Sequence, residues 1–316
     1  MPVFLEPFAT EFFTRALFGG SLVAVICGVV GTWVVIRGMA FLGEAIGHGM
    51  LPGVALATIL GLPLLLGAAV SAIVMSGAIG VLQRRGRLSY DTSIGLLFVA
   101  MLSLGVIIVS HSRSFATDAT ALLFGDILAI GSTDIVLLCV ALVVTLAVTT
   151  AMHRSFVATA FDRRLSQVLG LRPQLAHLAL VGLVTLAVVA SFQAVGTLLV
   201  VGLLIAPAVA ARAWTVRIPT AMALSAVTGV LAVTSGLLVS WHAGTAAGAS
   251  IAGSAILFAL CSSTARALFE RTFRRPTPTI PLTKGPHEPV EVTDRAPADG
   301  HLHRTSGVLH STRAGR

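Results

Sequence analysis

The chain has 316 residues, of which 56% are hydrophobic and only 11% are charged, and its mean hydropathy is +0.94. This composition is far more apolar than that of a soluble domain, so the sequence predicts an all-α, polytopic integral membrane protein. The net charge of +8 does not indicate nucleic-acid binding, because the basic residues lie in short loops and a tail rather than in one stripe.

Nine apolar runs approach the roughly 20 residues that a helix needs to cross a hydrocarbon core about 30 Å thick. Two of the breaks between them, at residues 61–63 and 191–196, are short, so a bundle of either eight or nine transmembrane helices fits. The runs lie near residues 12–36, 39–60, 62–82, 92–110, 134–152, 173–190, 195–211, 219–240 and 246–265.

The arginines predict how the bundle is oriented. If the helices alternate in direction, one side carries nearly all of them, and the opposite side keeps essentially Arg15 and Arg113. Basic loops favour the cytoplasm, so we expect the N-terminus outside, the C-terminus inside and a multi-pass protein in a bacterial plasma membrane. The arginines of the basic side are Arg37, Arg84, Arg85, Arg87, Arg154, Arg163, Arg164, Arg172, Arg212, Arg217 and those from Arg266 onward.

The second run contains a polar pair within the segment "RGMAFLGEAIGHGMLPG". Glu44 is the only acidic residue well inside a predicted span, and a charge there costs several kcal/mol unless it is paired or hydrated. His48 lies four residues later on the same helix face. A carboxylate and an imidazole suit divalent manganese, zinc or iron. The alternatives are a structural pair that ties two helices together and a proton relay in a secondary transporter that needs no ATPase.

Two prolines are expected to kink their helices. Pro52 has no amide hydrogen for the carbonyl of His48, and Pro207 likewise frees the carbonyl of Leu203, although plain packing is an equal alternative for Pro207. Two small-xxx-small spacings near the polar pair should let neighbouring helices approach closely. These are Gly43 with Gly47, and Gly49 with Gly53.

The segment "FVATAFDRRLSQVLGLRP" interrupts the apolar pattern between the fifth and sixth runs. Its apolar residues follow helical spacing, a glycine ends the pattern, and polar residues occupy the other face, which predicts a short amphipathic cytoplasmic helix. On periodicity alone, a helix lying on lipid headgroups is as good an interpretation as one that binds a protein. The residues concerned are Phe161, Asp162, Leu165, Val168, Leu169 and Gly170.

After residue 266 the composition turns polar and rich in arginine, proline and threonine. Residues 267–316 are therefore expected to form a disordered cytoplasmic tail, and residues 1–266 the membrane domain. The chain lacks Gly-x-x-x-x-Gly-Lys-Ser/Thr, so it should not hydrolyse ATP, and it has no His-Glu-x-x-His motif of a zinc protease.

Three stretches together carry a resemblance to a known family: "VVIRGMAFLGEAIGHGMLPGVALA", "LLFGDIL" at 122–128 and "FQAVGTLLVVGLLIAPAVAAR" at 192–212. They resemble the permease subunit of metal-cation ABC importers of the ABC-3 type, which take up manganese, zinc or iron. The family usually has Asp at the position of Glu44 and Ser-His where Gly47-His48 stands. The resemblance implies that Glu44 and His48 pass the metal.

The same resemblance implies how the protein works and with which partners. The amphipathic segment would be the coupling helix that contacts a separate cytoplasmic ABC ATPase. The other partners would be an extracytoplasmic metal-binding lipoprotein or anchored protein, a second copy of the permease and the lipid bilayer, with no nucleic acid. The divalent ion would be cargo, and no cofactor would stay bound.

Overall fold

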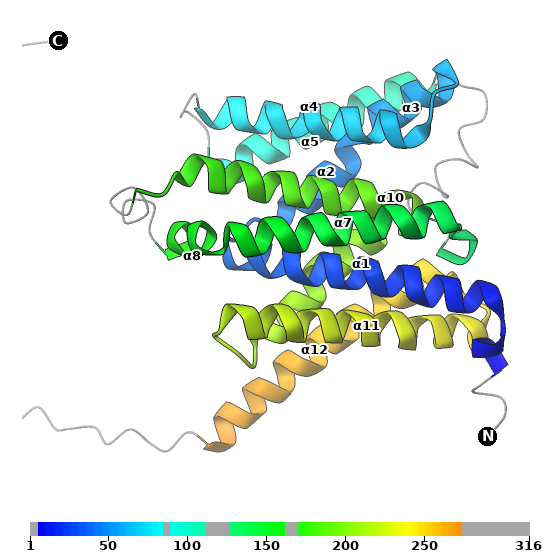
Figure 1. The fold of residues 1–316 in the computed structure, drawn as a ribbon, viewed down its shortest axis with the longest axis vertical. Coiled ribbons are helices and arrows are strands. Elements are labelled where there is room, and N and C mark those ends of the chain that lie inside the picture. The colour runs from blue at the N-terminus through cyan, green and yellow to red at the C-terminus, as the bar shows by residue number, and fades with distance from the viewer. Residues whose placement is uncertain (1–5, 85–88, 111–124, 126, 162–169, 274–316) are drawn as a thin grey trace, which may run out of the picture. The chain divides into compact units, whose positions relative to one another are not determined.

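The computed structural model describes residues 6–84, 89–110, 125, 127–161 and 170–273, and these residues form helices without any strand (Figure 1). The elements are η1 (Glu6–Ala9), α1 (Glu11–Ile36), α2 (Ala40–Gly49), α3 (Leu51–Leu60), α4 (Leu64–Arg84), α5 (Tyr90–Ser110), η2 (Ile127–Ala129), α7 (Ser132–Ala151), α8 (His153–Phe161), α10 (Pro173–Arg212), α11 (Ile218–Ala243) and α12 (Ala247–Phe273).

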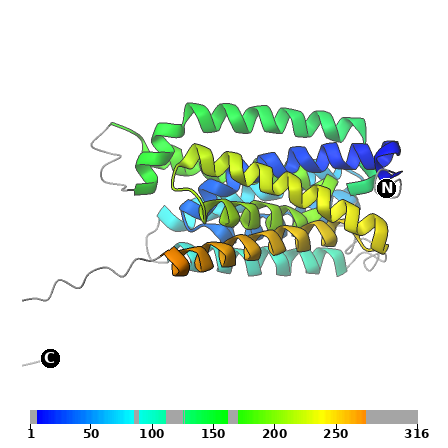
Figure 2. The same ribbon diagram turned by 90° about the horizontal axis from the view of Figure 1, so that it is seen from below.

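Within the described part of the chain, nine segments are long and apolar enough to cross a membrane. Both short breaks separate spans, which favours the nine-helix alternative. Gly61 ends α3 in the left-handed conformation with φ of +66°. Gly196 divides α10 with φ of +71° and ψ of 167°, so α10 supplies two spans, Pro173–Phe192 and Ala194–Arg212. The predicted helical membrane bundle is therefore confirmed, and Figure 2 shows the long helices running side by side.

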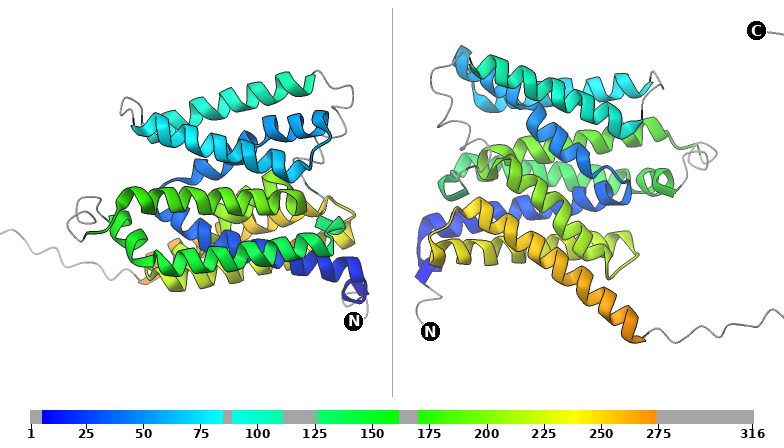
Figure 3. Two further views of the ribbon diagram at one scale, coloured as in Figure 1. Left: turned by 45° about the horizontal axis from the view of Figure 1, so that its top comes forward. Right: turned by 180° about the vertical axis from the view of Figure 1, so that it is seen from behind.

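The chain reverses direction at Gly196, so both ends of α10 lie at the same end of the bundle (Figures 1 and 3). That end also carries α8 and the C-terminal ends of α1, α4 and α12. The helix ends that bear the arginines of the predicted cytoplasmic side are thus gathered at one end. This is the arrangement that alternating spans require.

The two halves of the second predicted span pack against different neighbours. Helix α2 packs on α10 and α5, whereas α3 packs on α4 and α5. The two small-xxx-small pairs follow this division. A Cβ added at Gly43 or Gly47 would approach α10, and one added at Gly49 or Gly53 would approach α4. The glycines therefore let α2 and α3 contact two different helices closely, as the spacing predicted.

The contact between α3 and α4 is a backbone-to-backbone crossing. A Cβ on Gly67 would lie 2.3 Å from the carbonyl oxygen of Gly53, a distance at which one helix must move. We expect Gly67→Ala to destabilise the protein by about 1–3 kcal/mol, measured as a lower melting temperature of the purified permease in detergent. Gly77→Ala is the matched control, because Gly77 lies on the same helix with nothing within 4 Å of its Cβ position. Equal melting temperatures for the two variants would contradict this packing.

Helix α12 continues past residue 266, the expected end of the membrane domain, and ends at Phe273. Most of the predicted tail, residues 274–316, lies outside the described residues.

Candidate functional site

The candidate site begins at the junction between α2 and α3. Helix α2 ends at Gly49, Met50 is the junction residue and Pro52 lies in the first turn of α3. The Ser71 hydroxyl of α4 donates a 2.7 Å hydrogen bond to the carbonyl oxygen of Gly49. A polar side chain from a neighbouring helix therefore contacts the backbone where the span is interrupted, as is typical of broken membrane helices.

Glu44 and His48 contact each other on the last turns of α2. The Oε1 atom of Glu44 lies 2.8 Å from Nε2 of His48, and their side chains are only 28% and 16% exposed. The imidazole ring packs edge-to-face against Phe98 of α5, with ring centroids 5.4 Å apart. The pair on α2 thus faces α5, as expected for polar groups directed into a bundle rather than into lipid.

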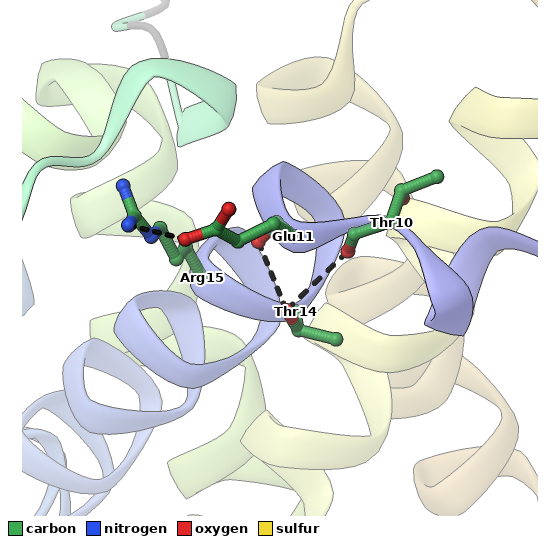
Figure 4. Close-up of polar contacts among 4 residues, drawn as sticks. All are labelled: Thr10, Glu11, Thr14 and Arg15. Carbon is green, nitrogen blue, oxygen red and sulfur yellow. Dashed lines mark hydrogen bonds and ion pairs between the residues drawn. The ribbon is translucent and has the colours of Figure 1, made fainter.

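A second glutamate with a basic partner four residues later shows what an ordinary surface pair looks like in this protein. Glu11 accepts a hydrogen bond from Arg15 in the first turn of α1, where Thr14 also donates to the carbonyls of Thr10 and Glu11 (Figure 4). The Glu11 and Arg15 side chains are 78% and 49% exposed. Exposed pairs contribute little to stability, so the burial of Glu44 and His48 sets them apart.

The geometry of the pair leaves one nitrogen free for another ligand. An ionised carboxylate only accepts hydrogen bonds, so a neutral His48 donates its Nε2 proton to Glu44 and keeps a lone pair on Nδ1. Nδ1 is buried and has no hydrogen-bond partner among the described residues. A histidine whose second ring nitrogen is held by a carboxylate is the usual arrangement of metal-binding histidines.

The pair alone is an incomplete metal site. Among the described residues, no three His, Cys, Asp or Glu side chains come together. In this geometry His48 offers one nitrogen ligand and Glu44 a nearby negative charge, and a bound ion would need further donors such as hydroxyls, carbonyls or water. Such a site suits an ion that passes through better than one that is bound permanently.

The break in α10 lies beside the pair. A Cβ placed on Gly47, between Glu44 and His48 in the chain, would lie 3.6 Å from Cβ of Thr197. Thr197 directly follows Gly196, the residue with non-helical dihedral angles. The sequence pattern did not single out Thr197, although a glycine before a threonine inside an apolar run was a usable signal of a break near α2.

The other predicted site residues lie elsewhere or outside the described ranges. Pro207 lies within α10, where the non-helical dihedral angles are at Gly196. Phe161 ends α8 with 80% of its surface exposed, and Gly170 has φ of +69°. Asp162, Leu165, Val168 and Leu169 lie outside the described residues, so the amphipathic helix stays a prediction.

Comparison with known proteins agrees with this architecture. The model of the ABC 3 transport family matches residues 9–266. The chain is 36% identical over 242 residues to the manganese transport system membrane protein MntC of Halalkalibacterium halodurans, covering 76% of this chain and 82% of the relative. It is 34% identical over 248 residues to the chelated iron transport system membrane protein YfeD of Yersinia pestis, covering 78% and 82%.

Two solved structures share the fold. The structure of PsaBC from Streptococcus pneumoniae in complex with Fab matches with a TM-score of 0.74 and 33% identity, over 83% of this chain and 94% of that one. An inward-facing conformation of a metal-chelate type ABC transporter matches with a TM-score of 0.66 over 82% and 86%. Because the identity is only 13%, this match supports the fold and nothing further.

Proposed function

Because the chain belongs to the ABC 3 transport family, we propose that it forms the membrane path of an ATP-driven importer of divalent manganese or iron. The chain is a multi-pass membrane permease, and ATP hydrolysis belongs to a separate subunit of the transporter. The relatives support the choice of cargo, since they are described as manganese or chelated iron transport proteins. The ion is cargo rather than a resident cofactor.

The observation that carries the proposal is the partly buried Glu44–His48 pair with its free Nδ1 atom. A divalent ion that leaves water needs replacement ligands inside the bundle. Nδ1 of His48 can bind the ion while Glu44 keeps the ring oriented, and the second carboxylate oxygen supplies negative charge nearby. An imidazole ligand with a carboxylate nearby suits manganese, iron or zinc, so the choice of manganese or iron rests on the relatives.

Transport then proceeds by alternating access. An extracytoplasmic metal-binding protein delivers the ion to the end of the bundle opposite α8. Closure of two ATPases on a permease dimer, transmitted through the segment that follows Phe161, opens the path inward past Glu44 and His48. In the proposed orientation the C-terminal tail is cytoplasmic, and the gathering of the arginine-bearing helix ends at the α8 end supports it.

The proposal is tested by metal accumulation in metal-starved cells that express the permease with its cognate ATPase and binding protein. Elemental analysis should show manganese or iron uptake that disappears when the ATPase carries an inactivated Walker motif. Uptake that persists without ATP hydrolysis would instead identify a proton-coupled secondary transporter, in which Glu44 and His48 relay protons. Accumulation of zinc alone would overturn the choice of cargo.

A further inference from the structure

We propose that the Thr197 hydroxyl is a further protein ligand, in addition to Nδ1 of His48, of the ion that passes Glu44 and His48. The inference rests on the proposed function and adds a ligand from a different helix. The proposed site would therefore use residues from two places where a helix is interrupted, the α2–α3 junction and the reversal of α10.

The Thr197 side chain is buried without a hydrogen-bond partner. It is 2% exposed, and its Oγ1 atom has no partner among the described residues. A threonine in a helix commonly donates to the carbonyl four residues earlier, as Thr58 and Thr185 do here. Gly196, with its non-helical backbone, lies between Thr197 and the carbonyl four residues before it, so Thr197 does not form this hydrogen bond. A buried hydroxyl without a partner is destabilising, so a ligand that binds it would supply the interaction that the folded chain lacks.

The position of Thr197 fits this role. Its Cβ and Cγ2 atoms lie 3.6 and 3.8 Å from the Cβ position of Gly47, so the Thr197 side chain lies within van der Waals distance of α2 at this glycine. Gly47 lies three residues after Glu44 and one before His48, on the part of α2 that carries both. Two buried acceptor atoms without partners, Nδ1 of His48 and Oγ1 of Thr197, therefore belong to adjoining segments.

The added ligand would change which ion the site prefers. Nδ1 of His48 and the Thr197 hydroxyl would together supply one nitrogen and one oxygen ligand, with the Glu44 charge nearby. Oxygen ligands suit manganese, whereas zinc is favoured by nitrogen and sulfur. The hydroxyl should therefore favour manganese over zinc and complete the incomplete pair.

The test measures binding of Mn²⁺ to the purified permease–ATPase complex in detergent by electron paramagnetic resonance of the free ion, with Zn²⁺ as competitor. Thr197→Val keeps the shape of the side chain and should raise the Kd for Mn²⁺ about tenfold, while zinc competes better. Thr197→Ser keeps the hydroxyl and should bind Mn²⁺ within about twofold of the wild type. Thr145→Val is the matched control, because Thr145 of α7 is also fully buried with an unpartnered hydroxyl.

The outcomes separate this inference from the proposed function. Wild-type affinity in Thr197→Val, with weakened binding in Glu44→Gln, would overturn the role of Thr197 and leave the pair in place. Wild-type affinity in both variants would overturn the proposed site itself. Equal weakening in Thr145→Val and Thr197→Val would show a general packing effect and would also overturn the inference.

Discussion

Replacing Glu44 by glutamine is expected to reduce manganese accumulation at least about 100-fold without lowering the amount of folded permease. Glutamine has nearly the same shape, and its amide oxygen can still accept the hydrogen bond from Nε2 of His48. What disappears is the negative charge that compensates the divalent ion in a partly buried site. The measurement is uptake by elemental analysis, normalised to folded permease from fluorescence-detected gel filtration.

His48→Ala should reduce uptake to a similar extent, because it removes the nitrogen ligand that Glu44 orients. If the two residues act as a unit, the double variant should transport no worse than either single variant. Additive losses would instead indicate two separate sites along the path.

Glu11→Gln is the control for charge removal as such. Glu11 also has a basic partner four residues later, but that pair is exposed in the first turn of α1. Loss of the Glu11 charge should leave metal uptake and the amount of folded permease unchanged. If Glu44→Gln lowered folded permease and uptake in parallel, the buried pair would be structural, and the proposed ion path would be wrong.

The membrane spans could be predicted from the sequence because hydropathy and length report directly on crossing a bilayer. The breaks at Gly61 and Gly196 looked equally slight in the sequence. Both prove to separate spans because each glycine adopts a positive φ that other residues rarely tolerate. Periodicity and composition could not decide this, since a glycine inside a membrane helix is common.

The site was only partly predictable for a different reason. Glu44 and His48 share one helix, so their spacing alone places them on one face, and the structure brings them to 2.8 Å. Thr197 lies about 150 residues away in the chain and is brought against Gly47 only through packing of α10 on α2. Local spacing carries no information on such contacts. The amphipathic segment after Phe161 stays a prediction, because most of it lies outside the described residues.

Gly125→Ala is expected to have a large effect on stability, because it combines backbone strain with a clash. Gly125 has φ of +63°, a left-handed conformation that costs an alanine about 1–2 kcal/mol. A Cβ there would also lie 2.3 Å from the backbone nitrogen of Gly196 and 2.4 Å from the carbonyl carbon of Val195. Backbone atoms cannot rotate away, so the α10 reversal would have to move, at about 1–3 kcal/mol more. Differential scanning fluorimetry of the purified permease should show a large fall in melting temperature.

Gly244→Ala separates the two contributions. Gly244 has the same φ of +63°, but nothing lies within 4 Å of its Cβ position. It should lose stability only through backbone strain, so the difference between the variants measures the contact with the α10 reversal. Because Thr197 follows that reversal, Gly125→Ala permease that still folds should also bind Mn²⁺ more weakly, whereas Gly244→Ala should bind normally. Equal melting temperatures for the two variants would mean that Gly125 does not pack against the α10 reversal. The position of Thr197 near α2 would then lose this support.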